Sequence, residues 1–302
     1  MNPPSRSRIP RRTKGGAGCP SQPSGAVATP PPASSQGNLL TLHQVRHHAT
    51  PPGHFTLWWL GQAGFLVQSP RGQVVALDPY LTNSCKAIGE QNGLNFDRQL
   101  PPPLRPEELA EVDAILFTHS HQDHCDPDTL SAARRANPHG LYLAPPETVE
   151  KLRALGVPPG EILTVWPNKT HSLGDLTIRA TFAIPLGGDD LTHVGYLLRV
   201  DGGPTVYFTG DTGWHEVLAD AVAPHHPDVL VAVINPAFRN LSPAEAALLA
   251  RRLDVKAVVP CHYDLFADNC QPPQLLRTNL VQLGIGDRYR VLRHGAAFTW
   301  PE

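Results

Sequence analysis

The stretch Phe117-Thr118-His119-Ser120-His121-Gln122-Asp123-His124-Cys125-Asp126 decides how this chain folds and what chemistry it can hold. Three imidazoles and one carboxylate within a few residues offer far more ligand capacity than a fold requires. In an extended chain His119 and His121 point to the same side, and a tight turn after them would bring Asp123 and His124 round to face the same point. Imidazole and carboxylate suit zinc, manganese or iron, and the mixture can hold two such ions close together.

A strand signal precedes this cluster and a helix signal follows it. Val112 to Phe117 is predicted to be a buried strand, Asp126 fits a helix N-cap, and Pro127 fits the first helical residue. The cluster therefore lies at a strand-to-helix turn, where sites are usually built. The alternative is a plain histidine-rich polar loop in a chain that holds 15 histidines. The flanking signals favour a metal site over that alternative.

The first 50 residues differ in composition from the rest of the chain. They are rich in Pro, Ser, Gly and Arg, and they contain six of the 25 basic residues and none of the 27 acidic ones. Such a segment buries too little surface to offset the entropy of ordering it, so residues 1–50 are predicted to be a disordered basic tail. An organelle transit peptide and a non-native extension both fit this composition. Residues 51–302 are predicted to form a single domain.

Strand and helix signals in residues 51–302 predict an α/β (α+β) fold. Short β-type runs at 55–60, 64–67 and 74–77 form a meander, and helix–strand alternation follows the histidine cluster. A long irregular stretch is expected between Asp78 and Pro103, and loops of that length are usually functional or flexible. Ser242 and Glu245 form a capping box at the start of a late helix. The pattern predicts two mixed β-sheets packed face to face with helices outside, a four-layer αββα sandwich.

Three further ligand-type side chains stand at the ends of other predicted strands. They are His193, Asp211 in the turn Thr209-Gly210-Asp211-Thr212-Gly213, and His262. Each is weak evidence alone, because an Asp between glycines is common in turns and a lone histidine is commonly structural. Their shared position strengthens them, since the strand ends of one sheet converge on one rim.

These motifs together resemble the metallo-β-lactamase-fold hydrolase superfamily, and within it the L-ascorbate-6-phosphate lactonase group. Supporting segments are Leu60-Gly61-Gln62-Ala63-Gly64-Phe65-Leu66, Leu77-Asp78-Pro79-Tyr80 and Val258-Val259-Pro260-Cys261-His262-Tyr263-Asp264-Leu265-Phe266. Ser242-Pro243-Ala244-Glu245-Ala246 and Leu292-Arg293-His294-Gly295 also resemble the N-acyl-phosphatidylethanolamine phospholipase D branch. The resemblance implies the αββα fold and a metal-dependent hydrolase.

The resemblance also implies how the ligands divide between two Zn²⁺ or Mn²⁺ ions. His119 and His121 would bind one ion, Asp123, His124 and His262 the second, and Asp211 would bridge them. The family commonly places a third histidine just after the strand that here ends Thr181-Phe182-Ala183-Ile184-Pro185, and none stands there. His193 is the nearest substitute.

Three functions are weighed for this site. The first is hydrolysis of a small lactone, with a phosphorylated sugar lactone as one candidate, by a metal-bound hydroxide. The second is a phosphodiesterase or phospholipase D-like activity, and the third is a non-catalytic, metal-stabilised binding module. Asp123 and His262 are the predicted catalytic residues. Tyr263, Asp264 and Asn235 are predicted to contact a small-molecule substrate.

Composition indicates which kinds of partner the protein can bind and in which compartment it works. Hydrophobic residues make up 41% and charged residues 17% of the chain, which is typical of a globular enzyme. Residues 51–302 carry a net charge of −8, so no nucleic-acid partner is expected. No apolar stretch is long enough for a transmembrane segment. Five scattered cysteines without a CxxC pair favour a reducing, cytoplasmic setting, and homo-oligomerisation is left open.

Overall fold

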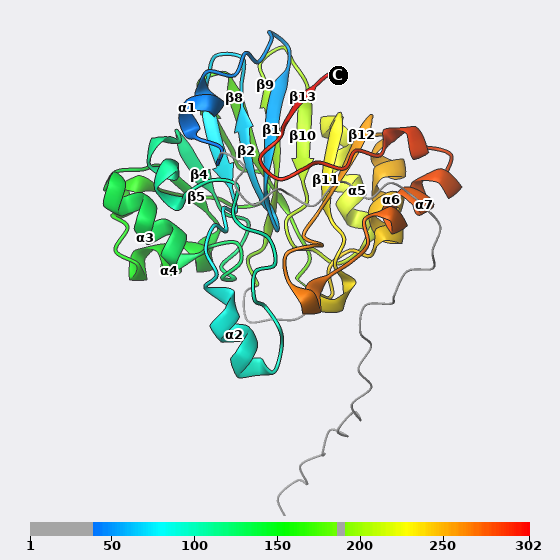
Figure 1. The fold of residues 1–302 in the computed structure, drawn as a ribbon. Coiled ribbons are helices and arrows are strands. Elements are labelled where there is room, and N and C mark those ends of the chain that lie inside the picture. Colours follow the sequence, from blue (N-terminus) through cyan, green and yellow to red (C-terminus); the bar gives the residue numbers. More distant parts are fainter. Residues whose placement is uncertain (1–38, 186–190) are drawn as a thin grey trace, which may run out of the picture. The chain divides into compact units, whose positions relative to one another are not determined.

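The computed structural model describes residues 39–185 and 191–302, and Leu39–Glu302 form one compact unit (Figure 1). Residues 1–38, most of the predicted tail, lie outside the described residues. Helix α1 (Leu42–Arg46) lies within the segment that the composition predicted to be a disordered tail. Thr41 and Gln44 form a capping box at its start, and Leu42 and Val45 are buried against the domain. The predicted boundary at residue 51 is therefore about a dozen residues too late.

Within the described residues the strands form two mixed sheets, as predicted. The first sheet has the order β13 (Ala297–Trp300), β1 (Phe55–Gly61), β2 (Gly64–Gln68), β3 (Val74–Leu77), β4 (Ala114–Leu116), β5 (Tyr142–Ala144) and β6 (Ile162–Thr164). The second has the order β12 (Ala257–Cys261), β11 (Val229–Val233), β10 (Thr205–Phe208), β9 (Val194–Val200), β8 (Leu176–Phe182) and β7 (Thr170–Leu173). Each sheet combines antiparallel hairpins with parallel neighbours, namely β3 to β6 in one and β10 to β12 in the other.

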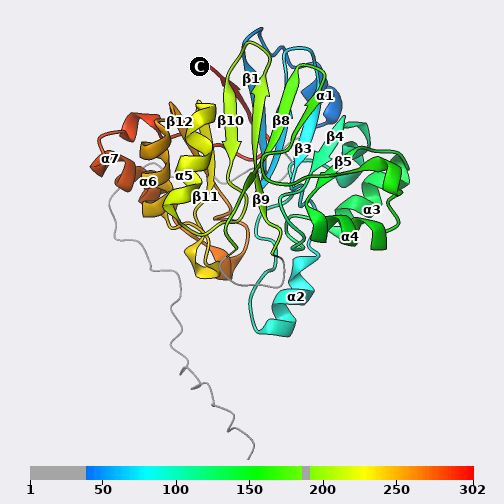
Figure 2. The same cartoon turned by 180° about the vertical axis from the view of Figure 1, so that it is seen from behind.

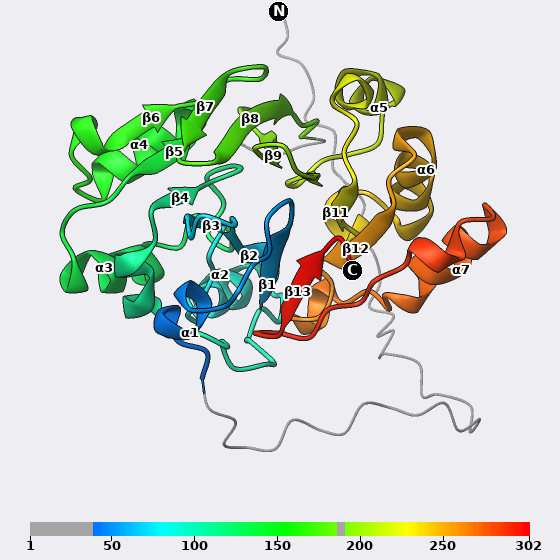
Figure 3. The same cartoon turned by 90° about the horizontal axis from the view of Figure 1, so that it is seen from above.

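Helices on the outer sides of the two sheets are α3 (Pro127–Ala136), α4 (Pro146–Ala154), α5 (Glu216–Val222), α6 (Pro243–Leu253) and α7 (Gln274–Gln282) (Figures 1 and 2). Helix α2 (Cys85–Asn92) lies at one end of the strands instead. Short 3₁₀ turns are η1 (Pro106–Glu111), η2 (Pro159–Glu161), η3 (Ala223–His225), η4 (Pro236–Phe238), η5 (Ala267–Asn269) and η6 (Gly286–Arg288). Figure 3 shows α3 and α4 on one side of the strands and α5, α6 and α7 on the other. Within the described residues, every helix is too short or too polar to cross a bilayer.

Strand β1 shows why the sheets need cover on both faces. Its residues are buried throughout, and successive side chains point to opposite faces. Leu57 and Trp59 enter the core between the two sheets, whereas Trp58 and Leu60 pack in the cluster beneath α1, α3 and α4. A strand that is apolar on both faces is stable only between two packed layers. The αββα arrangement predicted from the sequence is confirmed.

The stretch between Asp78 and Pro103, predicted to be irregular, contains α2. Gly93 ends this helix in the left-handed conformation, at φ 70°, which glycine adopts without steric cost. Asp126 holds the segment before α2, because its carboxylate accepts hydrogen bonds from Thr82 Oγ1 (2.7 Å) and Ser84 Oγ (2.8 Å). These contacts join residues about forty positions apart, so local sequence patterns could not reveal them. In Figure 1, α2 projects at the lower end of the strands.

We expect Ser242→Ala to lower the free energy of unfolding by about 1 kcal/mol. The Ser242 hydroxyl accepts from Glu245 N (3.2 Å) and the Glu245 carboxylate accepts from Ser242 N (2.8 Å), so the predicted capping box is present. Urea unfolding followed by circular dichroism measures the change. Ser131→Ala, the same substitution at an exposed interior position of α3, is the control and should have no destabilising effect. Equal losses in the two variants would contradict the capping role.

Candidate metal centre

The loop between β4 and α3 brings its ligand-type side chains together by a tight turn. Strand β4 is buried, and the loop turns back where His124 N (3.1 Å) and Cys125 N (2.8 Å) both donate to His121 O. Asp126 caps α3 by accepting from Asp128 N at 3.1 Å, as predicted. The turn directs Asp123 and His124 towards the same region as His119, as the sequence indicates.

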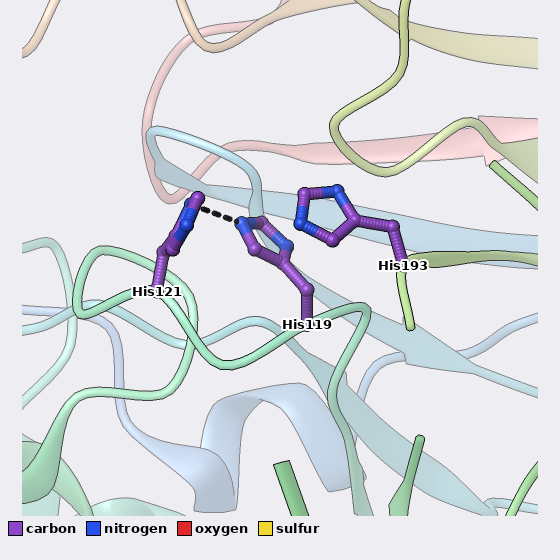
Figure 4. A group of neighbouring side chains, drawn as sticks. All are labelled: His119, His121 and His193. Carbon is purple, nitrogen blue, oxygen red and sulfur yellow. Dashed lines mark hydrogen bonds between the residues drawn. The ribbon is translucent and has the colours of Figure 1, made fainter. Parts of the chain in front are cut away.

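A first group consists of His119, His121 and His193, whose ligand atoms all lie within 4.8 Å of one another (Figure 4). His119 Nε2 lies 2.9 Å from His121 Nδ1, and the His119 and His193 ring centroids are 4.0 Å apart. His193 directly precedes β9, whose Val194 pairs with Phe182 of β8. It therefore stands across the hairpin from the place where the family resemblance expected a histidine.

A second group consists of Asp123, His124 and His262. His124 Nε2 lies 3.2 Å from His262 Nε2, and His262 Nε2 lies 3.2 Å from Asp123 Oδ2. His262 follows β12, the edge strand of the second sheet, so this group joins residues from both sheets. This is the set that the family resemblance implied for the second ion.

Asp211 lies between the two groups. Its Oδ1 is 3.4 Å from His124 Nε2 and 3.5 Å from His262 Nε2, and it also forms a ligand-sized group with His119 and His124. Among the described residues, this oxygen accepts no hydrogen bond although it is buried. Its second oxygen accepts from Asn240 Nδ2 at 2.7 Å. An oxygen in this position fits the bridging role that the resemblance implied.

The two groups fit divalent cations by their geometry and by their donor chemistry. Two imidazole nitrogens on one tetrahedral zinc ion, each about 2.05 Å from it, would lie about 3.3 Å apart. The facing nitrogens of the first and second groups are 2.9 and 3.2 Å apart. Imidazole and carboxylate without thiolate suit zinc, manganese or iron.

Burial and neighbouring charges set the protonation of these side chains. Burial, followed by the neighbouring histidines, lowers the pKa of His119 well below its usual value, so its imidazole is neutral and able to bind a cation. Burial would also lower the pKa of His124, but Asp211, Asp123 and Asp78 together outweigh it and raise that pKa. Burial would raise the pKa of Asp123, but His124 and His262 outweigh burial and hold this pKa low. Asp123 is therefore a carboxylate.

Asp78 orients histidines of both groups, a role that the sequence did not reveal. This fully buried carboxylate accepts from His124 Nδ1 at 2.8 Å, from Thr118 Oγ1 at 2.5 Å and from Thr118 N at 2.7 Å. Thr118 Oγ1 in turn lies 3.0 Å from His119 Nδ1. These bonds leave the Nε2 atoms of His119 and His124 facing the centre. Such outer partners fix the tautomer and ring orientation of metal-binding histidines.

Side-chain amides hold other members of the two groups. Gln62 Nε2 donates to Asp123 Oδ2 at 2.8 Å, and the Asn269 amide lies 3.2 Å from His262 Nδ1. Gln62, Asp78 and His262 have positive φ angles of 52°, 42° and 62°, which are uncommon for residues with a Cβ. His262 N donates to Gln62 O at 2.9 Å, so two of these residues support each other. Left-handed backbone at several non-glycine positions is typical of a functional site.

Both groups open onto one cavity of about 410 Å³. It is lined by Cys85, Ile88, Phe96, His121, Gln122, Asp123, Pro185, His193, Asp211, Asn235, Phe238, Asn240, His262, Phe266 and Asn269. Asn235 is therefore in the wall, as expected for a substrate contact. Tyr263 and Asp264 are not: Tyr263 packs on Trp59 with ring centroids 5.1 Å apart, and the Asp264 carboxylate faces His294 Nε2 at 3.4 Å. The left-handed turn at His262 directs the two following side chains away from the cavity.

Comparison with known proteins, like the geometry of the two ligand groups, indicates a metal-dependent protein. The model of the β-lactamase superfamily domain matches residues 75–263. A metal-dependent hydrolase (UPF0173) of Myxococcus xanthus is 31% identical over 229 residues, 72% of this chain and 74% of that protein. A protein of Salmonella heidelberg named probable L-ascorbate-6-phosphate lactonase UlaG is 25% identical over 299 residues, 85% of this chain and 84% of that protein.

Solved structures support the fold. Igni18, a metallo hydrolase from Ignicoccus hospitalis, superposes with a TM-score of 0.65 at 22% identity over 82% of this chain and 99% of its own. An isothiocyanate hydrolase from Delia radicum gut bacteria superposes with a TM-score of 0.66 at 19% identity, over 80% and 98%. The resemblance drawn from the histidine motif is thus confirmed. This chain belongs to the metal-dependent hydrolases of the β-lactamase superfamily.

Proposed function

We propose that the chain hydrolyses the ester bond of a small lactone. The observation that carries the proposal is that two adjacent ligand groups, joined by Asp211, open onto one cavity with Asp123 in its wall. Similarity to the probable lactonase over 85% of the chain supports the lactone as substrate. Two ions, Zn²⁺ or Mn²⁺, are proposed, with His119, His121 and His193 holding one and Asp123, His124 and His262 the other.

The roles of the side chains follow from their positions. A bound divalent cation lowers the pKa of water and polarises a carbonyl oxygen. Asp123, 19% exposed and held by Gln62, can orient an attacking water or accept its proton. Asn235 is buried in the wall, and its Nδ2 donates no hydrogen bond within the described residues, so it can donate to a substrate oxygen. Water adds to the carbonyl carbon, the ring C–O bond breaks, and the leaving oxygen takes a proton to give a hydroxy acid.

A substrate panel tests this proposal on protein of measured metal content. Lactones, linear esters and phosphodiesters are offered at equal concentration, and acid release is followed in a pH-stat. Turnover of lactones above that of the other classes supports the proposal. Turnover of phosphodiesters alone would assign the chain to the phosphodiesterase alternative.

Metal removal tests whether the metal centre is catalytic or purely structural. After chelation we expect lactone hydrolysis to stop and to return when Zn²⁺ or Mn²⁺ is restored. Elemental analysis accompanies each step. A chain that binds metal yet hydrolyses none of the three substrate classes, with or without added ions, would fit the non-catalytic binding module.

A further inference from the structure

One sector of the cavity wall is apolar. It consists of Cys85, Ile88, Phe96, Pro185, Phe238 and Phe266. These residues come from α2 and the loop after it, from the segment after β8, from η4 after β11, and from the segment after β12. Burial raises the pKa of the Cys85 thiol, so this side chain is neutral as well. The metal centre thus lies beside a surface suited to hydrocarbon.

Three aromatic rings form the centre of this apolar sector. The Phe96 ring centroid lies 5.6 Å from that of Phe238 and 5.1 Å from that of Phe266. Phe238 is 40% exposed and Ile88 is 36% exposed, so apolar area still faces solvent at the cavity. A ligand that covers this apolar area removes it from water, and this burial contributes hydrophobic free energy to binding.

The close packing of Phe96 against α2 keeps this sector in place. A Cβ on Gly89 would lie 2.8 Å from Leu94 O and 2.9 Å from Phe96 Cβ, so a residue larger than glycine at this position would displace the loop. Gly89 therefore permits the close approach of Phe96 to the helix. The apolar sector is built into the fold rather than formed by scattered surface side chains.

The described part of the cavity wall contains no lysine or arginine. Three basic side chains on neighbouring segments are engaged elsewhere. Lys86 pairs with Asp97 at 2.9 Å, and Arg98 donates to Leu100 O at 2.7 Å and Tyr80 O at 2.8 Å. Arg239, which follows Phe238, also has a partner of its own. A phosphate at the far end of a substrate would lose water there without gaining a cation from the wall.

We propose that the cavity accepts a neutral lactone carrying an alkyl or aryl substituent, rather than a phosphorylated sugar lactone. The reacting carbonyl would lie at the histidine and aspartate groups, and a ring oxygen would accept from Asn235 Nδ2. The substituent would cover Ile88, Phe96 and Phe238. This inference rests on the proposed lactone hydrolysis and specifies its substrate class.

A matched set of γ-lactones tests the substrate class. The unsubstituted ring, rings with alkyl chains of two to six carbons, and a ring with a phosphorylated chain of matched length are compared by kcat/KM. We expect kcat/KM to rise about threefold to fourfold per added methylene until the sector is covered. We expect the phosphorylated lactone to be turned over at least about tenfold less efficiently than the hexyl lactone. A preference for the phosphorylated lactone, or indifference to chain length, would overturn the inference.

Two substitutions test whether the preference for longer alkyl chains comes from the apolar sector. Phe238→Ser should reduce the ratio of kcat/KM for the hexyl lactone to that for the unsubstituted ring by about tenfold. Val281→Ser, at a 59% exposed position on α7 outside the cavity wall, should leave this ratio unchanged. Metal content and melting temperature are measured for both variants. A ratio that is unchanged in Phe238→Ser overturns the inference.

Failure of the proposed activity can be told apart from failure of this inference. Binding of alkyl lactams, which resemble the lactones but resist hydrolysis, is measured by calorimetry on metal-loaded protein. If no lactone is hydrolysed but lactam affinity rises with chain length and falls in Phe238→Ser, the activity is wrong and the apolar ligand class stands. If lactones are hydrolysed without any such dependence, the ligand class is wrong and the activity stands.

Discussion

Asp123→Asn is expected to lower kcat for lactone hydrolysis by about 10²–10⁴-fold, the range attributed to a positioned general acid or base. The amide has the same size and can still accept the hydrogen bond from Gln62 Nε2, which is 2.8 Å long in the native protein. It cannot take a proton from water. The effect should therefore be on kcat, with the fold unchanged. Steady-state kinetics at saturating metal, with elemental analysis of the same samples, measures it.

The matched control for this variant is Asp220→Asn. Asp220 is 69% exposed on α5 and pairs with Arg252 at 3.5 Å, so the same chemical change there should leave kcat within about twofold. Metal content distinguishes loss of a ligand from loss of proton transfer. An Asp123→Asn enzyme that keeps both its metal and more than a third of native kcat would exclude the assigned role.

The second large effect is expected for Asp78→Ala, a substitution outside the cavity wall. It removes a fully buried carboxylate that accepts three hydrogen bonds, two from Thr118 and one from His124. Removing one partner from a buried charged pair costs about 3–5 kcal/mol of stability. Loss of such an outer partner also weakens metal binding by about 10–100-fold. Denaturant unfolding and chelator competition measure the two losses.

Asp78→Asn serves as the second variant in case the alanine variant does not fold. It preserves the volume and one acceptor oxygen, so a smaller loss of stability is expected, while metal affinity should still fall because one nitrogen now faces a donor. Asp97→Ala, in an exposed pair with Lys86, is the control and should leave stability nearly unchanged. Native metal affinity in both Asp78 variants would show that Asp78 does not orient His119 and His124.

The sequence predicted the parts of the site that depend on local signals. The strand before His119 and the cap at Asp126 locate the loop, and period-two alternation places His119 and His121 on one side. Asp211 and His262 could be added because the ends of neighbouring strands meet at one rim. The αββα layers followed from the strand meanders and the helix–strand alternation, and the burial of β1 on both faces agrees with that arrangement.

The remaining features depend on contacts that no local pattern encodes. Asp78 looks like a residue at a strand end until β3 and β4 pair and place it beside Thr118. Helix α2 has a polar, glycine-containing sequence with weak helix propensity, and contacts such as that between Gly89 and Phe96 support it. Tyr263 and Asp264 were assigned to the substrate because they adjoin His262, but its positive φ reverses their direction.

His193 carries a lesson for recognising such sites from motifs. In an antiparallel hairpin, residues directly opposite each other have Cβ atoms only about 5 Å apart, so either strand can supply a side chain to the same site. A pattern search that requires a histidine after β8 would reject this chain, although β9 supplies one through the Phe182–Val194 register. Sequence signatures for this centre are therefore better written in terms of paired hairpin positions than of fixed spacing along one strand.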